Sequence, residues 1–326
     1  MLLYQSETYN PYFNIAAEEY FLKNFDTSFF YLYINEPSII VGKHQNTTAE
    51  INTPWVFKNN IKVVRRLSGG GAVYHDKGNL NYCFIKKGEK GSLVDFKKYT
   101  LPIINALKSL GVNANLRGKS DLVIDNMKFS GNAEHLFHNK ILHHGTLLFS
   151  TELPKLNSAI KADWSKFADR AVRSNRSTVT NILPHLQKQL TINEFTEIII
   201  KTALSEIDSV KKYELTTTDK KAINRLVAEK YSNWEWNFGY SPEYKFYKTI
   251  NTNNGLLNIS MEIKKGKIES VKLILNNKTF DNASLIEQSL INTPHYYPIV
   301  KQKLELLFQN NINLPFTFPE VLEIVF

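Results

Sequence analysis

Three consecutive glycines, Gly69 to Gly71, lie between two strand-like segments and constrain this chain more than any other feature. The segment before them, Lys62–Arg66, contains two valines and ends in two arginines; the segment after them, Ala72–Ile85, is rich in apolar residues. Glycine loses the most conformational entropy on folding, so three in a row indicate a loop that approaches a ligand closely. Two arginines beside backbone N–H groups favour an anion. A glycine-rich hairpin turn explains the glycines alone equally well.

A second segment, Lys128–Ala133, places a lysine before a Ser-Gly pair, and His143–Leu148 follows it. A lysine in such a turn is usually an exposed surface residue, so this segment by itself decides nothing. Together, however, these segments closely resemble the lipoate–protein ligase family, part of the biotin/lipoyl ligase superfamily. Its loop motif RRxSGGGAVYHDxGN matches Arg65–Asn79, and its motifs KxSGxA and HHGTLL match the other two segments.

The resemblance extends from Asn10–Ala16 to Trp234–Gly239, in order. It implies an α/β fold: a mixed-sheet catalytic domain like those of biotin/lipoyl protein ligases, followed by a small α/β C-terminal accessory domain. A boundary near Tyr240, after an aromatic cluster, divides the chain into residues 1–240 and 241–326. Beyond it, two alternating segments flank the turn Lys265–Gly266, which predicts a hairpin.

Local patterns predict the individual elements. Asn14 is expected to cap a first helix, with Glu18 and Glu19 in its first turns. Pro102 is expected in the first turn of a helix over Tyr99–Leu110. The other predicted helices are Ile192–Ile207, Thr218–Tyr231, Ser284–Ile291 and Tyr297–Phe308, and the other predicted strands are Phe29–Ile34, Ser38–Val41, Leu122–Ile124, Met127–Ser130, Leu142–Phe149, Leu256–Ile263 and Ile268–Leu275.

The resemblance implies an ATP-dependent ligase. Lipoate would attack the α-phosphate of ATP to give lipoyl-adenylate and pyrophosphate, and an acceptor lysine would then take the lipoyl group and release AMP. The expected acceptors are apo lipoyl domains of 2-oxoacid dehydrogenase E2 subunits and the glycine cleavage H protein. Both steps concentrate negative charge, so fixed cations and backbone donors should dominate catalysis. Lys128 is the expected catalytic residue, because its ammonium can contact both the acid oxygen and the α-phosphate.

The remaining site residues follow from the same motifs. Arg66 is preferred over Arg65 for the ATP phosphates, because strand alternation sends the two side chains to opposite faces. The expected ATP-binding residues are Arg66, Gly71, Ala72, Val73, Tyr74, Asp121 and Lys128, and the expected lipoate-binding residues are Ser68, Gly69, Gly70, Lys128 and His144. Asp121 is equally interpreted as a turn cap, since Ser120 replaces the family's usual Asn. His75, Asp76 and Asn79 are expected to organise the loop.

Magnesium is expected with ATP, because the phosphates need charge neutralisation. The sequence shows no dedicated metal site. Four neighbouring histidines, His135, His138, His143 and His144, match no standard zinc spacing, and no cysteine lies among them. The sequence therefore predicts no zinc site at these histidines.

Composition indicates the cellular compartment and the kind of partner to expect, but it does not indicate the activity. The first residues, Met1–Glu7, lack a signal-peptide pattern, no apolar run is long enough to span a bilayer, and Cys83 is the one cysteine. We therefore expect a cytoplasmic protein without a membrane partner. The net charge of +9 comes from scattered lysines, which fits an acidic protein partner better than nucleic acid.

Three alternatives remain open. A lipoyl or octanoyl transferase of the same fold would use a preformed adenylate or a carrier-bound acyl group, in some relatives through a cysteine thiolate. Cys83 lies in a strand-like segment, however, and reads better as a small buried hydrophobe. A biotin–protein ligase would typically carry a GRGR-type loop. A non-enzymatic module that binds acidic proteins or nucleic acid would not need both motifs.

Overall fold

A computed structural model describes residues 1–88, 94–160, 163–205, 207–309 and 314–326. The chain divides into two compact units, each assembled from separate parts of the sequence. Unit 1 comprises Met1–Lys43, Lys62–Asn157 and Ser174–Asn233, and unit 2 comprises His44–Ile61, Ser158–Arg173 and Trp234–Phe326. Two segments upstream of Tyr240 therefore pack with the C-terminal residues.

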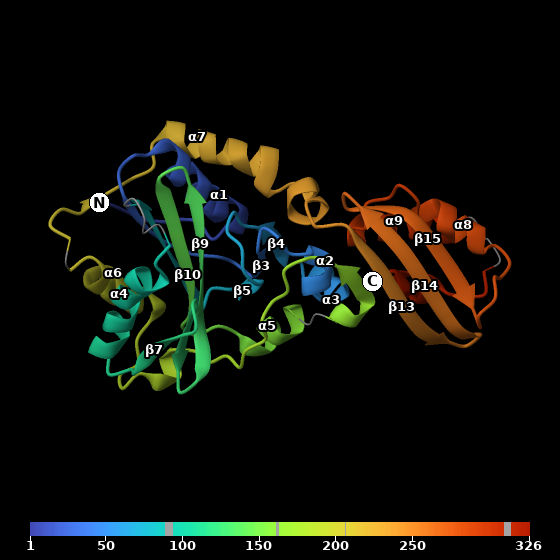
Figure 1. Cartoon of the computed structure of the whole chain (residues 1–326), viewed down its shortest axis with the longest axis horizontal. Coiled ribbons are helices and arrows are strands. Elements are labelled where there is room, and N and C mark those ends of the chain that lie inside the picture. Colours follow the sequence, from blue (N-terminus) through green and yellow to red (C-terminus); the bar gives the residue numbers. More distant parts are fainter. Residues whose placement is uncertain (89–93, 161–162, 206, 310–313) are drawn as a thin grey trace. The chain divides into compact units, whose positions relative to one another are not determined.

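Unit 1 is built on an eight-stranded sheet with the order β12-β1-β2-β6-β10-β9-β8-β7 (Figure 1). Its strands are β1 Leu2–Gln5, β2 Phe29–Ile34, β6 Asn79–Lys87, β7 Ala114–Arg117, β8 Asp121–Ile124, β9 Met127–Phe137, β10 Lys140–Leu148 and β12 Lys211–Lys212. β1 pairs in parallel with β12 and β2, and the other neighbours are antiparallel. The expected mixed-sheet α/β architecture is confirmed.

A second sheet in unit 1 has three strands in the order β4-β3-β5. These strands are β3 Ser38–Val41, β4 Lys62–Arg65 and β5 Val73–His75. The prediction of one strand over Ala72–Ile85 is wrong, because the chain turns at Asp76–Gly78 and passes into the large sheet. The Asp76 carboxylate accepts the Gly78 N–H at 2.9 Å and fixes this turn.

Helices cover both faces of the large sheet (Figure 1). They are α1 Pro11–Asn24, α4 Phe96–Ser109, α6 Ile192–Ala203 and α7 Thr217–Leu226, the last followed by a π-helical turn at Val227–Tyr231. On one face, Phe30 of β2 shares a buried core with Ile103 of α4 and Ile199 of α6. On the other, Phe21 of α1 stacks on Phe29 with ring centroids 4.5 Å apart. Both faces of β2 are buried, which explains its continuous aromatic run.

Two helix starts differ from the prediction. α1 begins at Pro11, and Asn10 caps it instead of Asn14, because proline suits the first helical position. Asn14 is buried instead, and its side-chain amide donates to Oδ1 of Asn35 at 2.8 Å. α4 begins earlier, after the cap Asp95, so Pro102 lies inside the helix. The start of α6 is confirmed; Glu206, within the predicted range, lies outside the described residues.

Unit 2 contains a four-stranded antiparallel sheet with the order β11-β13-β14-β15. Its strands are β11 Phe167–Asp169, β13 Tyr244–Thr252, β14 Gly255–Lys264 and β15 Lys267–Leu275, and its helices are α2 Thr47–Glu50, α3 Thr53–Lys58, α8 Ala283–Leu290, α9 Tyr297–Gln309 and α10 Phe318–Val325. The predicted hairpin and the two predicted helices are confirmed, whereas β13 and α10 were not predicted. Helix α5, Leu153–Ala159, contains residues of both units.

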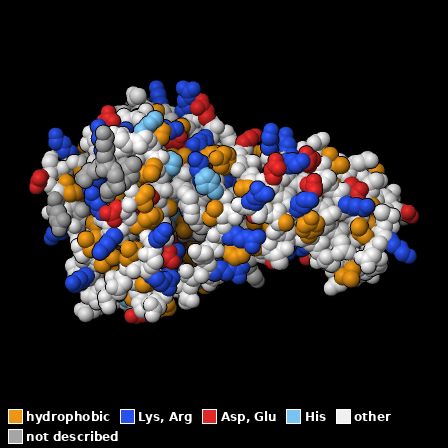
Figure 2. Space-filling view, in the orientation of Figure 1, with side chains coloured by type: hydrophobic (Ala, Val, Ile, Leu, Met, Phe, Trp, Pro, Cys, Tyr) orange, Lys and Arg blue, Asp and Glu red, His pale blue; other side chains and the backbone are white. Residues whose placement is uncertain are grey.

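Pairing and stacking explain why the earlier segments belong to unit 2. Phe167 of β11 is the register partner of Phe246 in β13. Phe57 of α3 stacks on Tyr297 of α9, with ring centroids 5.4 Å apart. Figure 2 shows Lys and Arg side chains interspersed with acidic ones over the visible face of each unit. Among the described residues, no helix has the length and apolar character to cross a membrane.

Candidate functional site

The glycine loop between β4 and β5 is held by the side chain of Arg66. Its Nη2 donates to the carbonyl oxygens of Gly69 and Gly71 at 2.6 and 2.8 Å. Its Nε donates to the Ser68 hydroxyl at 3.0 Å, and its Nη1 to the Ile40 carbonyl at 3.0 Å. Burial lowers the pKa of Arg66 to about 10, which still leaves it cationic at neutral pH. Arg66 therefore organises the loop and places a fixed positive charge beneath it.

The backbone of the loop lies close to Gly42, which directly follows β3. Gly70 has a φ of +86°, a conformation that favours glycine. A Cβ on Gly42 would lie 2.0 Å from the Gly70 carbonyl oxygen, so Gly42 also requires a glycine. Arg65 is fully buried and donates to the carbonyls of Gly42 and Lys43 at 3.0 Å. Both arginines thus fix the entry to the loop.

The middle of the loop remains accessible. Gly70 is exposed, Gly69 and the residues Gly71–Val73 are partly exposed, and Ser68 and Tyr74 on either side are buried. Of the predicted ATP-binding residues, Gly71, Ala72 and Val73 are therefore partly exposed, whereas Tyr74 of β5 is buried. Burial also raises the pKa of Tyr74, so its hydroxyl stays protonated.

A chain of buried polar groups connects the loop to α1. The Ser68 Oγ lies 2.6 Å from Nε2 of His144 on β10. Nδ1 of His144 lies 2.8 Å from a carboxylate oxygen of Glu18, which also accepts the hydroxyl of Tyr33 at 3.0 Å. These contacts assign a proton to Nδ1 of His144, which leaves Nε2 to accept the hydroxyl of Ser68. From the sequence, Glu18 is expected only to lie in a helix and Tyr33 only in a strand.

Lys128 extends from β9 beside Asp121 of β8. Its Nζ lies 2.8 Å from the Asp121 carboxylate, and the two side chains are 23% and 21% exposed. Arg117 lies 3.4 Å from the same carboxylate. Gly131 leaves room for the ammonium, since a Cβ there would lie 3.1 Å from Nζ of Lys128. The predicted catalytic lysine is thus partly exposed and oriented by a carboxylate.

An extended segment around Ser174–Thr180 connects Lys128 to the glycine loop. The Ser174 hydroxyl accepts the Ala72 N–H at 2.9 Å. Further along, the Lys128 N–H donates to the Thr178 carbonyl, and the Thr180 N–H donates back to the Lys128 carbonyl, both at 2.9 Å. The residue types around Ser174 give no signal of its contact with Ala72.

The histidines separate instead of forming a metal site. Strand alternation sends His143 and His144 to opposite faces of β10. His143 stacks on Tyr99 of α4, with ring centroids 5.0 Å apart, and its Nδ1 lies 2.8 Å from Glu134. Burial lowers the pKa of His143. Across the described part of the chain, no three His, Cys, Asp or Glu side chains form a group able to hold a metal ion.

His75, Asp76 and Asn79, which were expected to organise the glycine loop, lie at the turn that follows it. His75 is buried, and its Nδ1 lies 3.0 Å from the side-chain nitrogen of Asn35. Asp76 accepts the backbone N–H groups of Gly78 and Glu152 at 2.9 and 2.8 Å. Asn79 is buried at the start of β6. These contacts fix the turn that follows the loop.

Comparisons with known proteins agree with the motifs. Residues 10–204 match the lipoyl protein ligase A/B catalytic domain, and residues 241–324 match the bacterial lipoate protein ligase C-terminus. Lipoate–protein ligase 1 of Staphylococcus aureus is 41% identical over 90% of this chain and 90% of its own length. A crystal structure of lipoate-protein ligase A bound with ATP is 26% identical, with a TM-score of 0.62 over 73% of this chain and 98% of that chain. A structure described as a bi-partite lipoate protein ligase and its E2 lipoyl domain, from Thermoplasma acidophilum, is 26% identical, with a TM-score of 0.63 over 73% of this chain and 96% of that chain.

Proposed function

The chain belongs to the lipoate–protein ligase family, and we propose that it activates lipoate with ATP and transfers the lipoyl group to a lysine of apo lipoyl domains. In the first step, a carboxylate oxygen of lipoate attacks the α-phosphorus of ATP, and the bond to pyrophosphate breaks. In the second, the neutral amine of the acceptor lysine attacks the carbonyl of the lipoyl-adenylate. The amide forms, AMP leaves with the electron pair of the broken C–O bond, and the amine loses a proton.

The observation that carries this proposal is the position of Lys128. Its partly exposed ammonium lies beside Asp121, and hydrogen bonds through the Ser174–Thr180 segment connect its strand to the glycine loop. A fixed cation stabilises negative charge as it develops on the phosphate and on the carbonyl oxygen. In this role Lys128 binds both reacting groups and is not itself acylated.

The other motif residues divide between the two ligands. The backbone of Gly71, Ala72, Val73 and Tyr74 would lie along the nucleotide, and Arg66 supplies positive charge under the loop toward the phosphates. Ser68, Gly69, Gly70 and His144 would face lipoate. Ser68 accepts a hydrogen bond from Arg66 and donates one to His144, and these two bonds hold the loop in one conformation before any ligand arrives.

The residues beside Lys128 fit a magnesium ion that binds together with ATP better than they fit a metal ion held by the protein alone. Asp121 supplies one partly exposed carboxylate beside Lys128. Magnesium is usually bound by one or two carboxylates together with substrate phosphates and water. Bound there, it would neutralise phosphate charge during pyrophosphate release.

We also propose that residues 1–240 carry catalysis and residues 241–326 form the accessory domain. The expected acceptors are the E2 lipoyl domains of 2-oxoacid dehydrogenases and the glycine cleavage H protein, and the expected location is the cytoplasm. The burial of Cys83 favours the ligase over a transferase that uses a thiolate. Burial raises the pKa of this thiol well above its ordinary value, which makes it a poor nucleophile.

The decisive experiment measures lipoate-dependent release of pyrophosphate from ATP, before and after an apo lipoyl domain is added. The proposal predicts pyrophosphate release first and modification of the acceptor second. If the protein ignores ATP but transfers the lipoyl group from synthetic lipoyl-adenylate, it is a transferase and the proposed activation step is wrong.

A further inference from the structure

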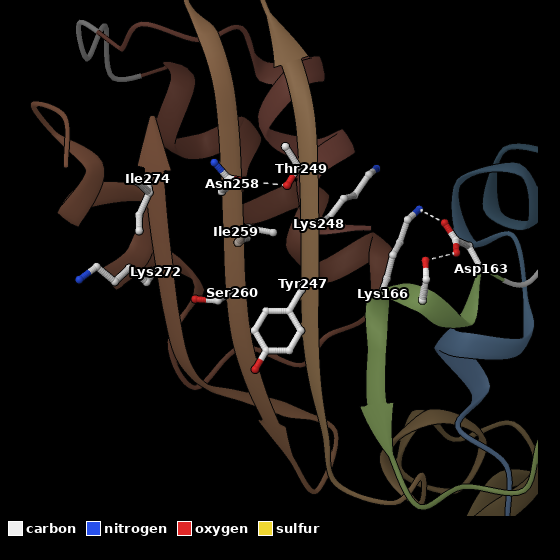
Figure 3. Close-up of a pocket in the computed structure, with 11 residues that line it drawn as sticks. Asp163, Lys166, Tyr247, Lys248, Thr249, Asn258, Ile259, Ser260, Lys272 and Ile274 are labelled. Atoms are coloured by element: carbon white, nitrogen blue, oxygen red, sulfur yellow. Dashed lines mark hydrogen bonds and ion pairs between the residues drawn. The ribbon is translucent and has the colours of Figure 1, made fainter. Parts of the chain in front are cut away.

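One face of the unit 2 sheet carries an open polar groove with a volume of about 500 Å³ (Figure 3). It is lined by residues of β13, β14 and β15 and by residues around the short 3-10 helix Trp164–Lys166. All of these residues belong to unit 2, so the groove is separate from the motif residues of unit 1. Neither motif predicted it.

Strand alternation explains why this face is polar. Leu257 and Met261 of β14 point into the buried core, which they share with Ile324 of α10. The intervening residues Asn258 and Ser260 point the other way and line the groove. One face of the sheet is therefore covered by helices, and the other carries side chains that can bind a polar partner.

Two rows of side chains cross the groove (Figure 3). Tyr247, Ser260 and Lys272 are register partners on three adjacent strands. Tyr247 is 47% exposed, and Lys272 is exposed as well. The second row consists of Thr249, Asn258 and Ile274; Thr249 donates its hydroxyl to Asn258 at 2.6 Å. The first row thus presents an aromatic ring and an ammonium at fixed spacing.

The groove is predominantly basic. Lys166, Lys248 and Lys272 line it together with the single carboxylate of Asp163. Lys166 lies 3.5 Å from Asp163, and Lys248 donates to the backbone carbonyl of Glu323 at 2.5 Å. Among the described residues, no carboxylate lies within ion-pair distance of Lys272. An incoming carboxylate would therefore find Lys272 without a carboxylate partner at one end of the groove, and at the other end it would share Lys166 with Asp163.

We propose that this groove is a docking surface for an acidic protein, a carboxylate-rich face of the acceptor lipoyl domain. The proposal rests on the proposed function for the identity of the partner. Carboxylates would pair with Lys166 and Lys272, and Tyr247 would supply apolar contact area at the centre. Single-stranded nucleic acid fits less well: its binding surfaces usually stack bases on several aromatic rings, and Tyr247 is the one aromatic side chain lining this groove.

The test compares two double variants of the full-length protein. The groove variant, Lys166→Glu/Lys272→Glu, reverses the charge of the groove. The control variant, Lys265→Glu/Lys301→Glu, makes the same change in net charge elsewhere on unit 2. For an apo E2 lipoyl domain, the groove variant should raise both the KM and the Kd measured by fluorescence anisotropy on the order of tenfold. The control should change each by less than about twofold. Lipoate-dependent pyrophosphate release without acceptor should stay the same in both.

A single variant, Tyr247→Ala, separates packing from charge and should weaken binding by about threefold or more. Equal Kd values for the wild type and the groove variant would overturn the docking surface while leaving the ligase activity untouched. If both double variants bound the lipoyl domain equally weakly, net charge alone would explain the effect, and the docking surface would also be overturned. Preferential binding of a single-stranded RNA, lost in the groove variant, would assign the groove to nucleic acid. Failure of the wild type to release pyrophosphate would refute the proposed function instead, because the anisotropy measurement does not depend on turnover.

Discussion

Nε2 of His144 lies 2.6 Å from Oγ of Ser68, so a histidine in the middle of the large sheet holds the residue that begins the glycine loop. Arg66 donates to the same hydroxyl at 3.0 Å. The loop is therefore anchored from β4 and from β10 at once. Such preorganisation reduces the ordering that substrates must induce, and several measurable consequences follow from it.

Lys128→Ala should abolish adenylate formation while the protein stays folded. The substitution removes the ammonium proposed to stabilise charge on the phosphate, and we expect pyrophosphate release to fall by about 100-fold or more. The lost ion pair with Asp121 should lower the free energy of unfolding by less than about 1 kcal/mol. Lys119→Ala, in the turn between β7 and β8, is the matched control. Near-normal turnover in Lys128→Ala would eliminate the assigned role.

Gly131→Ala should reduce kcat without unfolding the protein. The new Cβ would lie 3.1 Å from Cε and Nζ of Lys128, and a flexible side chain can move away from it. The ammonium would then leave its position, and we expect roughly a tenfold loss in kcat. Single-turnover measurement of adenylate formation checks this, and an unchanged rate would show that the position of Lys128 is not critical.

Ser174→Ala should raise the KM for ATP about three- to tenfold, because the Ala72 N–H loses its acceptor and the loop is held less firmly. The hydrogen bond is 2.9 Å long and partly buried. Ser177→Ala is the control from the same segment, since its hydroxyl makes an exposed contact of 3.4 Å with Arg117. Equal KM values for the two variants would contradict a role for Ser174 in positioning the loop.

Two glycine substitutions should differ sharply in stability. A Cβ at Gly78 would lie 2.3 Å from the backbone oxygen of Ser150, whereas a Cβ at Gly69 would meet nothing within 4 Å. We expect Gly78→Ala to lower the free energy of unfolding by about 2 kcal/mol or more, and Gly69→Ala to change it by less than about 0.5 kcal/mol. Urea denaturation measures both, and similar values would argue against the close contact with Ser150.

Stability should decrease in mild acid because His75 is buried in its neutral form. Burial, assisted by the charge of Arg66, lowers the pKa of His75 from 6.5 to about 3. Between pH 6.5 and about pH 3, the imidazole of His75 is protonated in the unfolded chain but neutral in the folded protein. The neutral form therefore contributes its full stability above pH 6.5, and this contribution is lost as the pH falls from 6.5 toward 3.

The size of this effect can be measured with a variant. Between about pH 6 and pH 5, the wild type should lose about 1 kcal/mol more unfolding free energy than His75→Gln. His138→Gln, which replaces an exposed histidine, should follow the wild type. A wild-type curve parallel to that of His75→Gln would show that His75 does not resist protonation.

Local patterns predicted much of the fold. The aromatic run at Phe29–Ile34 and the alternation around Lys265–Gly266 gave strands within one residue of those observed, because such patterns depend on neighbours in the chain. Predictions were wrong where two neighbouring residues could each mark the start or the end of the same element. Asn14 resembles a cap, yet Asn10, four residues earlier, caps the helix. Ala72–Ile85 reads as one strand although Asp76 closes a turn inside it.

The sequence by itself determined the two motifs, because motifs depend on residue types at short spacing. Through the family resemblance these motifs predicted the mixed α/β class and the proposed roles of Lys128 and the glycine loop. Only the tertiary structure decided which side chains hold the motif residues in position. Ser68 meets His144 across 76 positions, and Ala72 meets Ser174 across 102. His143 and His144 point to opposite faces of β10, and only the tertiary structure shows their partners, which are Tyr99 for His143 and Glu18 for His144. Contacts of this kind arise from packing between distant segments, and no local preference of the chain encodes them.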